Sequence, residues 1–177
     1  MNGFNVSEGG HVAVLLPPQS ISADSSATPI NPAFSMKNYK HASILIIPGA
    51  EATQDATTLL VYICSTAAGA TPVAIPFNYY FQALGGAGND VLSAINNAPA
   101  TGLVLAAGNF PANGLIVIEI DSDELEGATG GVLNASLGVD SYIGIGLGSP
   151  TAIDYASVVV ILSGPRFQNV SSPSVTV

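Results

Sequence analysis

Residues 113–120 read Asn-Gly-Leu-Ile-Val-Ile-Glu-Ile, and this stretch decides the fold class. The Asn-Gly pair is a strong turn signal, and five of the six residues after it are apolar, as in a strand that buries a face. The same combination of a short apolar run and a Gly, Pro or Asn turn recurs along the chain. The predicted strands are residues 42–47, 57–64, 73–81, 103–106, 115–120, 132–137, 142–147 and 156–162.

Helical periodicity is nearly absent from the sequence. The best candidate is residues 90–96, where Val91, Leu92 and Ile95 share one helical face for about two turns. Strands that alternate with helices would indicate a parallel sheet, and this alternation is missing. About eight short strands with Gly, Pro and Asn loops therefore predict an all-β antiparallel β-sandwich that is jelly-roll-like.

The prolines predict how the chain is divided. Residues 1–34 are expected to hold an N-terminal strand, ended by Pro17 and Pro18, and an extended Pro/Ser-rich arm over residues 17–34. Residues 35–168 form the predicted β-sandwich domain. Residues 169–177 are predicted to be a polar C-terminal tail.

Charge is unusually scarce in the 177 residues. Only 8% are charged, against a usual share of about 25%, and 48% are hydrophobic. We therefore expect much of the surface to be covered in a protein assembly. The 12 acidic and three basic residues give a net charge of −9, which disfavours nucleic acid and anionic membranes as partners.

The chain lacks the signals of export and of membrane insertion. No basic segment opens it, and no apolar run approaches the roughly 20 residues that span a bilayer. We expect a soluble protein that is synthesised in a cytoplasm and keeps its N-terminus.

Five carboxylates within eight residues form the densest polar cluster, directly after the strand at 115–120. They are Glu119, Asp121, Asp123, Glu124 and Glu126. A solvated turn is the interpretation we favour. The alternative is a calcium site at Asp121, Asp123, Glu124 and Glu126, because Ca²⁺ prefers carboxylate oxygens, although the spacing does not fit an EF-hand. No metal and no cofactor are expected.

Other candidate residues also have structural interpretations. Cys64 is expected to be a small buried hydrophobe, and His11 and His41 are expected to be structural. The glycines of residues 144–148, Gly-Ile-Gly-Leu-Gly, have no following helix or lysine, which disfavours a nucleotide loop and favours a strand crowded by its neighbours. With no nucleophile motif such as G-x-S-x-G, no catalytic residue is assigned and no enzyme is expected.

Three consecutive aromatic residues, Tyr79, Tyr80 and Phe81, raise the alternative of sugar binding. Consecutive residues on a strand point to opposite faces, so at most two of the rings share a face. Burial in the core on one side and at an interface on the other is the simpler interpretation.

Three stretches carry a resemblance to a known group of proteins. They are residues 34–42 (FSMKNYKHA), 118–125 (IEIDSDEL) and 158–167 (VVVILSGPRF). In that order and spacing they resemble small virion structural proteins of tailed bacteriophages, some of which are capsid decoration or cement proteins with a jelly-roll-like β-sandwich. The resemblance covers about residues 34–168.

The resemblance implies a homo-oligomer, a dimer or trimer, on the outer surface of the virion capsid. There it would bridge copies of the major capsid protein and stabilise the head. The alternatives are a tail, neck or fibre-associated β module of the same kind of particle, and a carbohydrate- or receptor-binding module.

Overall fold

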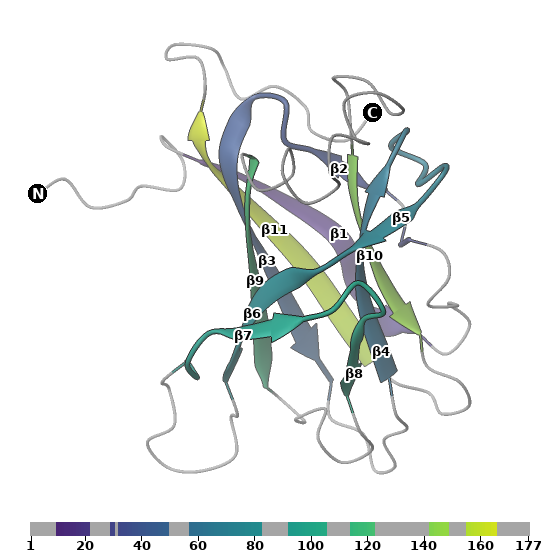
Figure 1. Ribbon diagram of the computed structural model, residues 1–177, viewed down its shortest axis with the longest axis vertical. Helices are drawn as coiled ribbons and strands as arrows, with labels where there is room; N and C mark the ends of the chain where they lie inside the picture. The colour runs from purple at the N-terminus through teal and green to yellow at the C-terminus, as the bar shows by residue number, and fades with distance from the viewer. Residues whose placement is uncertain are drawn as a thin grey trace, which may run out of the picture.

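Two antiparallel sheets packed face to face make up the protein (Figure 1). The computed structural model describes residues 10–21, 29–30, 32–49, 57–82, 92–105, 114–122, 142–148 and 155–165. Strands account for 72% of these residues, which confirms the predicted all-β sandwich. Within the described part, no helix is long and apolar enough to cross a membrane.

The larger sheet has six strands and the smaller has five. The order in the six-stranded sheet is β1 (Gly10–Ser20), β11 (Tyr155–Pro165), β3 (Tyr39–Pro48), β9 (Leu115–Asp121), β6 (Phe77–Gln82) and β7 (Asn96–Ala98). The order in the five-stranded sheet is β2 (Phe34–Ser35), β10 (Tyr142–Gly148), β4 (Thr57–Cys64) and β5 (Val73–Ile75), with β8 (Leu103–Leu105) also paired to β4.

Pairing between the strands is nested along the chain. β1 pairs with β11, β2 with β10, β3 with β9, and β4 with both β5 and β8, all antiparallel. Successive strands from β1 to β4 alternate between the two sheets. The N-terminal half of the chain therefore pairs with the C-terminal half in reverse order, and the paired strands enclose one core.

Alternate residues of the long strands form that core. Along β3, Ala42, Ile44 and Ile46 are fully buried, whereas the residues between them are partly or largely exposed. This period of two is the pattern of a strand with one face on the core. The matching inward residues of the neighbouring and facing strands are Ile116, Ile118, Ile120, Val158, Val160, Leu162, Leu59, Val61, Ile63, Ile143, Ile145 and Leu147.

The prediction of an extended arm over residues 17–34 is wrong for the residues at both ends of this segment. β1 continues through Pro17 and Pro18 to Ser20. Prolines are tolerated there because β1 is an edge strand whose register to β11 shifts between Val14 and Gln19. Residues 22–28 and 31 of the expected arm lie outside the described residues.

The two ends of the expected arm belong to the core. Ile21, Ala33 and Phe34 have no exposed surface. The Ile30 backbone N–H donates to the Ile145 carbonyl at 2.6 Å, and that of Ala33 to the Ala67 carbonyl at 2.8 Å. The division at residues 34 and 35 therefore does not separate an arm from the sandwich.

Two further predictions about strands and helices need correction. The single strand predicted at residues 73–81 is two strands, β5 and β6, which lie in different sheets on either side of Pro76. The helix predicted at residues 90–96 is wrong, because residues 92–95 are not helical and Asn96 begins β7. The strand predicted at 132–137 and the tail at 169–177 lie outside the described residues.

Crowding explains Gly144, one of the glycines of β10. A Cβ placed on Gly144 would lie 2.5 Å from Pro29 Cβ and 3.3 Å from Cys64 Sγ, so no larger side chain fits there. Cys64 itself has no exposed surface, and burial raises its thiol pKa to about 11. The predicted crowding is confirmed at Gly144, and the predicted buried cysteine is confirmed.

Substitution of Ile21 tests whether the expected arm is part of the core. Ile21→Ala should lower the free energy of unfolding by about 2–5 kcal/mol, because it opens a cavity at a fully buried position. Ile95→Ala is the matched control, since Ile95 is 58% exposed and should change the stability little. Urea denaturation measures both. Equal, small effects would mean that Ile21 does not belong to the core.

Candidate functional site: the outer face of the six-stranded sheet

The outer face of the six-stranded sheet is the side turned away from the core. Because side chains alternate along a strand, the residues between the buried ones of β3 point to this face. They are His41, Ser43, Leu45 and Ile47. The strand register then aligns them with outward residues of β1, β11, β9 and β6, in rows that cross the sheet.

One of these rows is entirely apolar, and we call it the apolar row. It crosses five strands, with Val14 opposite Val159, Val159 opposite Leu45, Leu45 opposite Val117, and Val117 opposite Tyr80. Val14 is 58% exposed, Val159, Leu45 and Tyr80 are each partly exposed, and Val117 is buried. Water therefore reaches most of the row, which is unfavourable for apolar side chains.

The next rows become progressively polar. Beside the apolar row, Val12 and Ile161 lie in line with Ser43, Glu119 and Asn78. The row after that places Ser163, His41 and Asp121 opposite one another. The outer face thus passes from an apolar region to a charged one within two rows.

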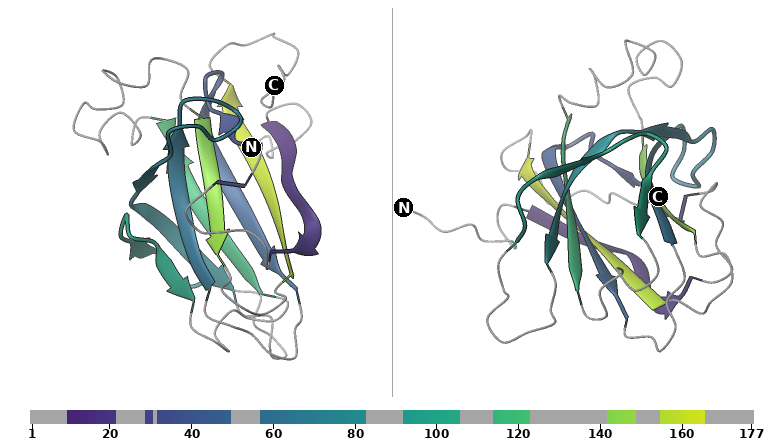
Figure 2. Two further views of the ribbon diagram at one scale, coloured as in Figure 1. Left: turned by 90° about the vertical axis from the view of Figure 1, so that its right-hand side faces the viewer. Right: turned by 60° about the horizontal axis from the view of Figure 1, so that its bottom comes forward.

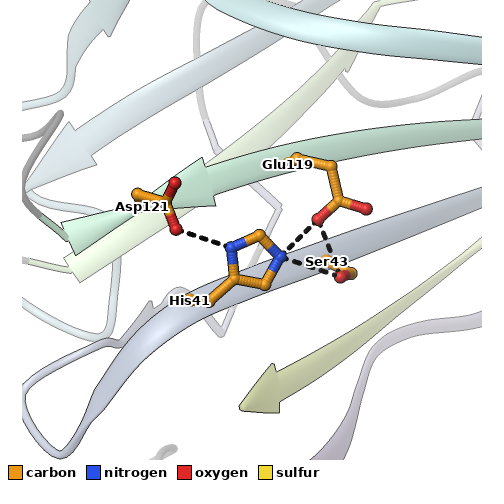
Figure 3. A network of polar contacts seen from close by, with 4 residues as sticks. All are labelled: His41, Ser43, Glu119 and Asp121. Carbon is orange, nitrogen blue, oxygen red and sulfur yellow. Dashed lines mark hydrogen bonds and ion pairs between the residues drawn. The ribbon is translucent and has the colours of Figure 1, made fainter. Parts of the chain in front are cut away.

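Four side chains form a hydrogen-bonded network in the charged region (Figure 3). His41 Nδ1 lies 2.7 Å from Asp121 Oδ1, and His41 Nε2 lies 2.5 Å from Glu119 Oε2. Ser43 Oγ donates to the same Glu119 oxygen at 2.8 Å. We call these residues the histidine network, and it ties β3 to β9 through side chains.

The geometry indicates that His41 is protonated on both ring nitrogens. Each nitrogen faces a carboxylate oxygen, which can only accept a hydrogen bond, so each must carry a proton. Partial burial of the ring lowers the pKa of His41. The hydrogen bonds to Asp121 and Glu119 and the charges of both carboxylates together outweigh burial and raise this pKa above its ordinary value of 6.5.

The network contains the residue types of a hydrolytic triad without the required proton acceptor. Ser43 Oγ is 3.3 Å from His41 Nε2, and Asp121 holds the other ring nitrogen. A triad histidine must accept the serine proton through a free lone pair. Here Nε2 donates to Glu119, and the Ser43 hydroxyl donates to that same carboxylate. The arrangement is a polar contact between strands.

The calcium candidate is only partly described. Asp121 is engaged by His41, while Asp123, Glu124 and Glu126 lie outside the described residues. Within the described ranges, no group of three or more His, Cys, Asp and Glu side chains is placed to hold a metal ion. The two carboxylates of the histidine network bind opposite sides of the imidazole ring, so they do not converge on a common point (Figure 3).

The other candidate residues lie apart from the histidine network. His11 lies in β1, where its ring is 6.4 Å from that of Tyr39. Tyr79 and Phe81 pack against the core, and Tyr80 points to the outer face between them. Two of the three consecutive aromatic rings are therefore used inside the sandwich.

Sequence reasoning missed the pairing of His41 with Glu119 and Asp121. The signal for it was present, since His41 and Ser43 are two residues apart on one strand, as are Glu119 and Asp121 on another. Alternate polar positions on two apolar strands indicate a shared solvent face. Only the register of β3 against β9 shows that the two pairs meet.

An NMR titration tests the protonation state of His41. The ring is expected to titrate above pH 6.5, and Asp121→Asn should lower its pKa by removing a charge and an acceptor. Because the folded-state pKa is raised, the stabilisation is complete below pH 6.5 and is lost as the pH rises through the raised value. Its size should be about 1 kcal/mol or less, since the groups are partly exposed.

Histidine variants provide the matched control for that titration. His41→Gln should remove this part of the pH dependence of unfolding, measured in urea between pH 5.5 and 8.5. His11→Gln should leave it unchanged, because His11 contacts a tyrosine ring and not a carboxylate. A His41 pKa below 6.5 would contradict the doubly hydrogen-bonded arrangement.

A chelation experiment tests the calcium alternative. EDTA should leave the melting temperature unchanged, because a solvated turn after β9 holds no ion that EDTA could remove. A bound ion stabilises the folded state by mass action. A fall of several degrees that calcium reverses would therefore show that the protein binds the ion, and loss of this effect in Asp123→Asn would assign it to the candidate site at Asp121, Asp123, Glu124 and Glu126.

No family model, no curated protein and no solved structure matches this chain in sequence or fold comparisons.

Proposed function

We propose that the protein is a virion structural subunit, a capsid decoration protein that binds the outer capsid surface and stabilises the head by bridging major capsid subunits. The observation that carries this proposal is the apolar row on the outer face of the six-stranded sheet. A surface of this kind is typical of contact with another protein.

The composition of the row supports protein docking. Its members come from five adjacent strands, and the exposed part runs without a gap over three of them, at Val14, Val159 and Leu45. Contiguous exposed apolar surface marks interaction sites in proteins. Interface centres are depleted in charge and enriched in aromatic residues, as at Tyr80 here. Burial of such surface contributes about 25 cal/mol per Å².

The distribution of charge supports the same proposal. Of the 12 acidic residues, only Glu119 and Asp121 fall within the described ranges, and both contact His41. The remaining ten lie in segments outside those ranges. β1, β11 and β6 carry no charged side chain, so this part of the outer face offers a partner a neutral surface.

The nested pairing of strands supports the jelly-roll-like connectivity that we propose for the sandwich. In a jelly roll, two Greek keys are built from eight strands in two sheets. Here the first strand pairs with the last, β2 with β10, β3 with β9, and β4 with β5 and β8. This is the fold that the resemblance to virion proteins implies.

Sugar binding has less support than protein docking. An aromatic surface for a sugar ring needs exposed rings on one face. Tyr79 and Phe81 pack against the core. Of these three consecutive rings, Tyr80 alone therefore lies on the outer face. A tail, neck or fibre module would use the same apolar row, and copy number distinguishes it from a decoration protein.

Particles that lack the protein provide the test. Added protein should bind their outer surface in hundreds of copies, seen by electron microscopy, and raise their resistance to heat, because many small contacts between capsid subunits add up. Leu45→Gln should weaken binding strongly, since it places an amide in the apolar row. Val104→Gln is the matched control, since Val104 is 65% exposed on β8 of the other sheet.

Two outcomes would contradict the proposal. A dozen copies or fewer per particle, or a position at the tail, would assign the protein to the tail, neck or fibre class. Equal binding by the Leu45 and Val104 variants would mean that the apolar row is not the docking surface. Circular dichroism of both variants checks that each remains folded.

A further inference from the structure

The edges of the two sheets are very unequal in length. β7, β5 and β8 have three residues each and β2 has two, whereas β1 has 11. β1 lies at the margin of the six-stranded sheet, beside β11 (Figure 2). Among the described residues, no strand pairs with its other side. Short strands protect an edge from pairing with another chain, and β1 does not have this protection.

Only one half of β1 is protected by other means. Pro17 and Pro18 lack the N–H that a further strand would need, and the register shift after Val14 bends the strand. From Gly10 to Val14 the register to β11 is continuous, and no proline or charged residue interrupts it. The segment able to accept a new strand is therefore Gly10–Val14.

We propose that this segment pairs antiparallel with the same segment of a second copy of the chain. A two-fold axis beside Val12 would place Val12 against its own equivalent and Val14 against Gly10 of the other copy. The two six-stranded sheets would join into one continuous sheet of two copies. Such an isologous contact is the commonest form of homodimer.

Charge at the edge is compatible with a second copy as the occupant. Each chain carries a net charge of −9, so two copies repel overall, and this repulsion is least where the contacting strands are uncharged. Within the described residues, β1 and its neighbour β11 contain no Asp, Glu, Lys or Arg, so the two strands themselves bring no like charges together at this edge. Pairing would also cover Val12 and Val14, which are 47% and 58% exposed.

The pairing would place the two outer faces side by side on the same surface. The rows that contain Val12 would lie in line, and the apolar row of each copy would meet the row of Gly10, Ser163 and His41 of the other copy. The dimer would let one decoration unit contact two capsid subunits. This use of the dimer rests on the proposed function. The pairing itself can be tested without any particle.

Sedimentation of the intact chain provides the first test. At tens of micromolar the protein should sediment as a dimer of the 17.8 kDa chain. Val12→Lys should sediment as a monomer, because a lysine at an edge opposes strand pairing and here would face its own equivalent. Val104→Lys, the same change at an exposed position of β8, should remain dimeric.

Cross-linking provides a second test that does not depend on disruption. Val12→Cys should form a disulfide-linked dimer on mild oxidation, since opposite residues of paired strands lie about 4.5–5.5 Å apart at Cβ. Val104→Cys should not. The natural Cys64 is buried, so the unmodified chain should not cross-link and sets the baseline.

The outcomes separate this inference from the proposed function. A wild-type monomer at tens of micromolar, or a Val12→Lys variant that stays dimeric, overturns the edge pairing. A monomeric chain that still binds particles overturns the pairing alone. A dimer that fails to bind particles overturns the proposed function and leaves the pairing intact.

Discussion

Packing of the two inner faces is the contact on which the rest of the structure depends. It fixes which residues of β3, β9 and β11 point inward, through fully buried positions such as Ile44, Ile118 and Val160. A shift of any strand by one residue would turn its apolar side chains outward, so the register is strongly determined. Everything on the outer face, including the apolar row and the histidine network, takes its place from this register.

The histidine network shows how few charges the sheets tolerate. In the described part of β9, the carboxylates of Glu119 and Asp121 both contact the one imidazole that β3 offers. Removing His41 would leave two acids close together on one face, where they repel each other. The network therefore partly compensates the two carboxylates at the charged end of the outer face.

The sequence was sufficient to predict the class of fold but not its edges. The apolar runs at 57–64, 115–120 and 156–162 all lie in strands, because β-branched and apolar residues at this spacing fit a buried sheet. Pro17 and Pro18 were misread as the end of a strand. Whether a proline is tolerated depends on the edge position of β1, which only the tertiary pairing determines.

The prediction of the helix at residues 90–96 failed, and the contacts of Glu119 and Asp121 were missed, for a related reason. Residues 92–95 fit a helical face over too few turns to outweigh the pairing of the adjacent Asn96–Ala98 with β6. Glu119 and Asp121 were grouped with acids that follow them in the chain. Their partners, His41 and Ser43, lie 76–80 residues away in the sequence. Contacts of that separation are set by strand order, which spacing alone does not give.

Placing the N-terminal segment in the core also changes how the protein would bind its partners. A free arm loses conformational entropy when it orders on a neighbour, and this cost lowers the net affinity. β1 and Phe34 are already held by strand pairing and burial, so that cost is met when the chain folds. Binding through the outer face and the edge of β1 would therefore use preformed, rigid surfaces. The affinity of such binding would depend on how well the apolar row fits the partner and not on the length of the terminal segments.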